Sequence, residues 1–194
     1  MSIDPSILMT SRVLGTLVFG MAVLGKLRHR DEFVGLVANY RLVPEPLVPV
    51  VAWLVIALET LVVLSLATGV ALGAGAGLAV TLLCVFALAM TINLARGRQE
   101  IDCGCFQSEL RQRLSVSLVV RNMVLTAAIL PLLEAGARSA GLVPLFGGEM
   151  QSAAFLQVLD GVAGGIVLFV LYQVFGQMLA LRDAIEAARK RFAS

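Results

Sequence analysis

The stretch LVVLSLATGVALGAGAGLAVTLLCVFALAMTINLA, residues Leu61–Ala95, contains no charged side chain. The hydrocarbon core of a bilayer is about 30 Å thick, and a helix crosses it with about 20 residues. The stretch is therefore too long for a single crossing. It predicts two membrane spans, the end of one and the whole of the next. Small residues at Thr68–Gly73 favour a tight turn between the two.

The whole chain carries the composition of a membrane protein. Of its 194 residues, 59% are hydrophobic and 14% are charged, whereas soluble domains average about 25% charged residues. Backbone groups in lipid must be hydrogen-bonded within their own segment, so the spans must be helices. We therefore predict an all-α polytopic membrane protein rather than a soluble all-α core, with residues 1–194 forming a single integral membrane domain. Five helical spans are expected, at about 5–25, 46–68, 71–95, 114–133 and 160–181.

The first span is expected to stay in the mature protein. It begins with polar rather than basic residues, and no A-x-A-like cleavage site follows its apolar run, so it does not have the pattern of a removed signal peptide. After it, Phe33, Leu36, Val37 and Tyr40 recur at helical spacing. This spacing predicts a short connecting helix that lies in the membrane interface.

Basic residues gather on one side of the predicted spans. Twelve of them lie in the loop after the first span, in the loop after the third span and in the C-terminal tail, against Arg12 and Arg138 on the other side. The positive-inside rule then places these loops and the C-terminus in the cytoplasm and the N-terminus outside. The twelve are Lys26, Arg28, Arg30, Arg41, Arg96, Arg98, Arg111, Arg113, Arg182, Arg189, Lys190 and Arg191.

Two of the three cysteines, Cys103 and Cys105, are separated by one glycine in the loop after the third span. Zinc usually takes four Cys or His ligands, and the single histidine, His29, belongs to another loop. Incidental cysteines are typically small buried apolar residues, which fits poorly with the adjacent Asp102. We favour a redox pair, because Gly104 allows a strained ring to close and strained disulfides are the labile, catalytic kind. Zinc binding and an incidental role remain as the alternatives.

The third cysteine, Cys84, lies inside the third span among Leu, Val and Phe. A thiol buried in apolar surroundings is inert. We therefore interpret Cys84 as a packing residue.

Ionisable side chains inside the spans are costly in lipid and usually face a partner within the bundle. Glu59 and Arg121 are two such residues. Either they pair with each other, or Glu59 is neutral and hydrogen-bonded to a hydroxyl such as that of Thr60 or Thr91. Asn122 turns to another helix face and is available for a bond to a neighbouring helix. All three are candidates for the floor of the thiol site.

Glycines at close helical spacing predict two close helix contacts. Gly73 and Gly77 form a G-x-x-x-G pattern, and Gly161, Gly164 and Gly165 form a similar small-residue face in the last span. Small residues at this spacing let membrane helices approach closely.

Several of these features together resemble one family. They are a first span ending in Lys26, a proline-containing entry to the second span, Glu59 within that span, and DCGCF at 102–106 followed by VRN at 120–122. With them the chain resembles the MauE family of methylamine-utilisation membrane proteins, within the wider group of MauE/DoxX-like redox-associated membrane proteins. Family members often carry glycine after this phenylalanine, where the present chain has Gln107.

The resemblance implies a role in maturing the disulfide-rich β subunit of methylamine dehydrogenase, whose quinone cofactor is made from tryptophan. It implies disulfide formation or relay at Cys103 and Cys105 in the bacterial inner membrane, with the thioredoxin-like MauD, MauF and, as a further candidate, MauG as partners. A thiol pair before the fourth span is also similar to vitamin K epoxide reductase, a four-helix bundle. That analogy suggests a quinone as electron acceptor and a bundle with one additional helix. It is an analogy of fold alone.

Two other functions compete with this one. A non-catalytic scaffold would dock MauF or the dehydrogenase precursor at the membrane. A small-solute transporter is disfavoured, because the sequence shows no inverted repeat. The basic residues are spread over loops rather than forming a nucleic-acid-binding patch, so no nucleic-acid partner is expected.

Overall fold

The computed structural model describes residues 4–98, 114–135 and 152–192, and these residues form helices and short connections with no strand. Five helices in these ranges are long and apolar enough to cross a membrane. The predicted all-α, five-span fold class is therefore confirmed. The elements are α1 (Pro5–Arg28), α2 (Arg30–Tyr40), the 3-10 helix η1 (Glu45–Leu47), α3 (Val48–Thr68), α4 (Leu72–Ala95), α5 (Val116–Ile129), α6 (Pro131–Ala135) and α7 (Ser152–Phe192).

Local sequence signals set the limits of the first two helices. Asp4 caps α1 by accepting hydrogen bonds from the backbone N–H and hydroxyl of Ser6, at 2.9 and 2.7 Å, and these bonds lower the pKa of the Asp4 carboxyl. A proline at the first helical position suits the fixed φ of a helix start. The predicted connecting helix is confirmed as α2, with Phe33 and Tyr40 as its buried residues.

The expected turn in the long uncharged stretch joins α3 to α4. Gly69 and Ala71 have left-handed backbones, with φ of 78° and 49°, and the Ser65 hydroxyl donates to the Val70 carbonyl at 2.8 Å. Gly75 faces the Ser65 side chain so closely that a Cβ would collide with it. In this hairpin the closest contact is therefore made by Gly75, between the two glycines of the predicted G-x-x-x-G pattern.

The fourth span is built from two helices. α5 ends at Ile129 and α6 begins at Pro131, because proline has no N–H with which to continue the helical hydrogen bonds. The apolar span nevertheless runs from Val116 to Glu134.

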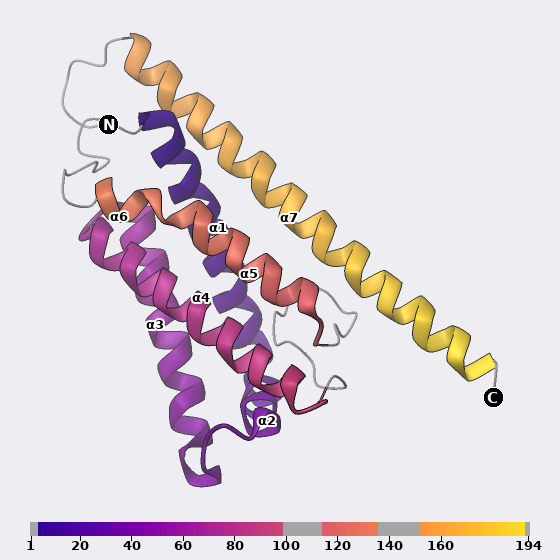
Figure 1. Ribbon diagram of the computed structural model, residues 1–194. Coiled ribbons are helices and arrows are strands. Elements are labelled where there is room, and N and C mark those ends of the chain that lie inside the picture. Colours follow the sequence, from indigo (N-terminus) through magenta and orange to yellow (C-terminus); the bar gives the residue numbers. More distant parts are fainter. Residues whose placement is uncertain (1–3, 99–113, 136–151, 193–194) are drawn as a thin grey trace.

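The spans pack around α1 (Figure 1). α1 contacts α3 and α7 extensively, and α4 packs against both α3 and α5. The main core gathers residues of α1, α3, α4, α5 and α6, with Phe19, Val62, Ala76, Ile129 and Leu132 among the most buried. α7 runs along the outside of the bundle beside α1.

A buried arginine joins α1 to α3. The guanidinium of Arg12, which is 5% exposed, donates to the Leu66 carbonyl at 3.1 and 3.0 Å and to the Ala67 carbonyl at 3.4 Å. These carbonyls lie in the last turn of α3, where carbonyls have no partner within the helix and the helix dipole favours a cation. Arg12 is thus a cap for α3 rather than a charge at the edge of the first span.

The predicted small-residue face of the last span is confirmed as the surface on which α1 and α7 meet. A Cβ at Gly161 would lie 2.6 Å from the Cβ of Met9, and a Cβ at Gly165 would lie 2.6 Å from the Cβ of Val13. The Thr10 hydroxyl donates to the Gly161 carbonyl at 3.2 Å. The two helices approach this closely because the glycines have no side chain.

We therefore expect Gly165→Ala to weaken the docking of α7 on α1 and to lower the thermal stability of the detergent-solubilised protein. The destabilisation should reach about 1–3 kcal/mol, the usual cost of overpacking. Gly20→Ala in α1 is the matched control, because an added Cβ there meets nothing within 4 Å. Equal melting temperatures for the two variants would contradict the assigned contact.

Candidate functional site

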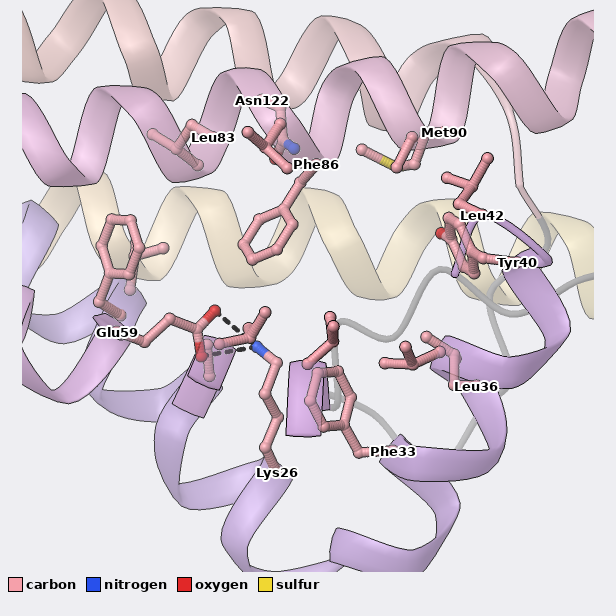
Figure 2. A pocket seen from close by; sticks show the side chains of 18 of the residues that line it. Lys26, Phe33, Leu36, Tyr40, Leu42, Glu59, Leu83, Phe86, Met90 and Asn122 are labelled. Carbon is pink, nitrogen blue, oxygen red and sulfur yellow. Dashed lines mark hydrogen bonds and ion pairs between the residues drawn. The ribbon is translucent and has the colours of Figure 1, made fainter. Parts of the chain in front are cut away.

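A cavity of about 280 Å³ lies in the half of the bundle next to α2 (Figure 2). Its walls come from α1, α2, α3, α4, α5 and α7 and are mostly aliphatic and aromatic, with Phe33, Leu36, Phe86 and Met90 among them. Its polar or partly polar residues are few: Lys26, Glu59, Asn122, Tyr40 and Tyr172. Such a lining suits an uncharged, largely apolar group with one hydrogen-bonding end.

A buried ion pair forms one wall of this cavity. The Lys26 ammonium donates to both carboxylate oxygens of Glu59, at 2.7 and 2.9 Å. The side chains are 7% and 1% exposed. Lys26 belongs to the last turns of α1 and Glu59 to the middle of α3, so the pair ties the end of one span to the centre of another.

Two aromatic rings complete the environment of the lysine. Its Nζ lies 5.3 Å from the centre of the Phe33 ring and 5.7 Å from the centre of the Phe86 ring. Both distances are within the range of cation–π attraction, which is stronger for a desolvated cation. Phe33 comes from α2 and Phe86 from α4, so the ammonium draws these two helices toward the pair.

The observed partner of Glu59 is a residue that neither of the two predictions names. The carboxylate pairs with Lys26, whereas the Thr60 and Thr91 hydroxyls donate to carbonyls of their own helices, those of Ile56 and Ala87. The sequence predicts a loop position for Lys26, because it is a charged residue at the end of an apolar run. α1 continues to Arg28, so its side chain points back into the bundle.

A signal for Lys26 is nevertheless present in the sequence. It lies three residues after Val23 and seven after Phe19, both of which are buried. Residues at these spacings share one face of a helix. Lys26 therefore continues the core-facing stripe of α1, and this periodicity would have placed it inside.

Arg121 and Asn122 are both buried on α5, at 6% and 5% exposure. The guanidinium carbon of Arg121 lies 5.0 Å from the centre of the Tyr172 ring of α7. Asn122 is part of the cavity lining and points into it (Figure 2). Arg121 thus approaches α7 and Asn122 faces the cavity, which agrees with the expectation that the two use different faces of their helix.

The expected thiols, Cys103 and Cys105, lie outside the described residues, as do Asp102 and Gly104. The described residues on either side of this segment are Arg98 and Leu114. The Arg98 guanidinium donates to the Asn93 amide oxygen at 3.3 Å. Leu114 is 2% exposed and packs with Tyr40 and Met90, which also line the cavity. Leu114, the first described residue after the thiols in the sequence, therefore lies beside the cavity wall.

Cys84 differs from the expectation of a buried packing residue. It is exposed on α4, because the core-facing stripe of this helix runs through Ala79, Leu83, Ala87 and Met90. In a bilayer Cys84 therefore faces lipid. In the part of the chain that the structure describes, no three His, Cys, Asp or Glu residues gather in a way that could hold a metal ion.

The fold and this site define a class of protein: a multi-pass helical membrane protein with an apolar cavity walled by a buried lysine–glutamate pair. A sequence model described as methylamine utilisation protein MauE matches residues 4–135. A methylamine utilization protein MauE from Paracoccus denitrificans is 43% identical over 192 residues, which are 97% of each chain. The corresponding protein of Paracoccus versutus is 38% identical over 155 residues, 80% of this chain and 77% of its own length.

A third such protein, from Methylorubrum extorquens, is 35% identical over 173 residues, 87% of this chain and 86% of its own length. The chain belongs to the MauE family of methylamine utilisation proteins. No solved structure matches the chain to a significant degree. The resemblance to vitamin K epoxide reductase therefore stays a prediction.

We predict that Lys26→Met or Glu59→Met alone destabilises the protein by about 3–5 kcal/mol, because each leaves the partner buried without its counter-charge. The double variant Lys26→Met/Glu59→Met should recover most of the loss, because it removes both charges. A double-mutant cycle on denaturant unfolding in detergent measures the coupling.

The control for this cycle is the exposed pair Arg30 and Asp31, whose atoms lie 3.9 Å apart. Arg30→Met should change the free energy of unfolding by less than about 1 kcal/mol. A Lys26–Glu59 coupling below about 1 kcal/mol, which is usual for an exposed pair, would contradict the importance given to the buried pair.

Proposed function

We propose that the protein forms or relays disulfides through Cys103 and Cys105 during maturation of the methylamine dehydrogenase β subunit. In this reaction a thiolate of the client, or of a thioredoxin-like carrier, attacks the Cys103–Cys105 disulfide and forms a mixed disulfide. A second client thiolate then attacks the mixed disulfide. The client gains one disulfide and loses two electrons and two protons, and Cys103 and Cys105 become a dithiol.

The pair must then return its two electrons to an acceptor. We assign this role to a membrane-soluble quinone, which becomes a quinol by taking up two electrons and two protons. The apolar cavity supports this assignment, because it lies within the spans and has one polar wall formed by Lys26 and Glu59. A lipid-soluble ring with carbonyl oxygens matches such a lining.

The observation that carries the proposal is the position of Leu114, the first described residue after Cys103 and Cys105. Membership of a methylamine utilisation family supports a role in that pathway. The Cys-Gly-Cys sequence supports a redox role, because a disulfide across one residue is strained and strained disulfides are labile. Leu114, the first described residue after the segment, packs against two residues of the cavity wall, Tyr40 and Met90. This contact supports a thiol site at the cavity that Lys26, Glu59 and Asn122 also line, and these residues, with Asp102, Gly104 and Arg121, are the supporting residues of the proposal.

The proposed setting is the bacterial inner membrane, with residues 1–194 acting as one integral domain. Its partners in the proposal are the precursor of the dehydrogenase small subunit, MauD as thioredoxin-like carrier, MauF and MauG. If the protein is instead a scaffold for these partners, its cysteines have no chemical role.

Cys103→Ser and Cys105→Ser are each expected to abolish formation of active methylamine dehydrogenase, although the variant proteins still accumulate in the membrane. Cys84→Ser is the matched control and should retain full activity, because this thiol is exposed on the outer face of α4. The measurements are dehydrogenase activity and the thiol state of the β subunit in cells that carry each variant. Normal maturation by both serine variants would refute the relay and leave the scaffold.

Which side of the membrane carries the thiol segment is a separate prediction. The charge rule favours the cytoplasm, although a client outside the cytoplasm would need its oxidant on the outer side. α2 and the end of α4 lie at the same end of the bundle, and the α3–α4 turn lies at the other (Figure 1). Two exposed positions, Glu32 in α2 and Val70 in the turn, therefore report on the two sides.

In a cysteine-free chain, a thiol at Val70→Cys should react with a membrane-impermeant maleimide in intact cells. A thiol at Glu32→Cys should react only after the membrane is permeabilised. The reverse pattern would place the thiol segment outside and overturn the assignment from charge.

A further inference from the structure

The last span is the least buried of the five. The apolar stretch of α7 is Leu156–Arg182. Only 11% of its membrane-spanning part is buried inside the protein, against 28–39% for the other four spans. Its contact with the described bundle is made chiefly through the glycine face that meets α1 (Figure 1). Most of the surface of α7 is therefore open to lipid or to another membrane helix.

Two glutamines lie on that surface within the span. Gln173 is half-buried and Gln177 is exposed. Counted from the middle of Leu156–Arg182, they lie about 6 and about 12 Å along the helix, and both are within the half-thickness of the hydrocarbon core, about 15 Å. Neither side chain makes a hydrogen bond to any described residue.

The threonine hydroxyls in the described spans are all satisfied inside the chain. The hydroxyls of Thr60, Thr81, Thr91 and Thr126 donate to the carbonyl four residues earlier, at 2.7–2.8 Å. A glutamine amide offers two donors and an acceptor, and leaving these groups unbonded in hydrocarbon costs free energy. The glutamines of α7 therefore indicate a partner outside the described residues.

The glutamines continue an apolar seam along α7. Ile166, Val170, Gln173 and Gln177 follow one another at intervals of four, three and four residues, which is the spacing of residues that face a parallel partner helix. Ile166 is 47% and Val170 is 51% exposed. The seam is turned about 150° away from the glycine face, so one helix can contact α1 and a partner at the same time.

We propose that this seam, Ile166, Val170, Gln173 and Gln177, is the interface between two copies of the chain. A glutamine amide is both donor and acceptor, so Gln173 can bond Gln173 of the second copy, and Gln177 likewise, without any other polar residue. Two copies inserted in the same orientation bring the same residues face to face across a two-fold axis. Amide hydrogen bonds between helices are an established means of association in membranes. The interface is independent of the thiol chemistry proposed above.

The test uses the full chain with a fluorescent label, reconstituted in phosphatidylcholine–phosphatidylglycerol vesicles. Counting subunits by single-molecule photobleaching over a range of protein-to-lipid ratios gives the dimer fraction. We expect a dimer for the wild type and at least tenfold weaker association for Gln173→Leu/Gln177→Leu. These leucines make α7 more apolar, so failed insertion would not explain the loss.

Two further variants make the test specific. Phe175→Leu/Met178→Leu changes exposed side chains on the opposite side of α7 and should leave association unchanged. A photoreactive benzophenone side chain should crosslink two copies when placed at Val170 and not when placed at Leu171. A monomeric wild type, or a leucine seam variant that dimerises as well as the wild type, would overturn the interface. The interface would also be overturned if the benzophenone at Val170, in native membranes, crosslinked only to a different protein and never to a second copy of the chain.

Discussion

The arrangement of this bundle depends on a lysine and a glutamate that cannot be left unpaired in hydrocarbon. A lone ionised side chain at the centre of a membrane helix costs about 2.5–3.5 kcal/mol even on the lowest scales. The Lys26–Glu59 pair, at 2.7 Å, reduces that cost only if the end of α1 lies against the middle of α3. Because Phe33 and Phe86 also contact the ammonium, α2 must fold back toward the pair. The contacts of the Lys26 ammonium thus hold α1, α2, α3 and α4 together, and the cavity lies between these helices.

α1 supplies a second cation to the same neighbour. Arg12 bonds the terminal carbonyls of α3, and Lys26 bonds the carboxylate near its middle. The two cations are 14 residues apart, about four helical turns or 21 Å. Contacts at two such distant points fix both the register and the crossing of α1 on α3, whereas van der Waals packing of Leu and Val alone would tolerate sliding. α3 can therefore act as a rigid wall for the cavity.

Properties that depend on hydropathy and turn chemistry could be predicted from the sequence. The five spans, the α2 connection and the Gly69–Ala71 turn follow from the length of apolar runs and from residues that accept left-handed backbone angles. The pairing of Glu59 did not follow, because it depends on which helices are neighbours and on how far α1 continues. The outward direction of Cys84 depends on the rotation of α4, which a uniformly apolar sequence does not encode.

The contacts of α1 also explain why α7 can differ from the other spans. The residues that the family model matches, 4–135, include nearly the whole wall of the cavity and the two buried cations of α1, whereas α7 follows them. α7 adds Tyr172 to the cavity and is attached to α1 by a face of glycines, a contact that needs close approach but no charge. The ion pair and the Arg12 cap are made without α7, so its remaining faces are not needed to hold the cavity together. Polar residues on those faces can therefore serve an interaction outside the single chain without weakening the site inside it.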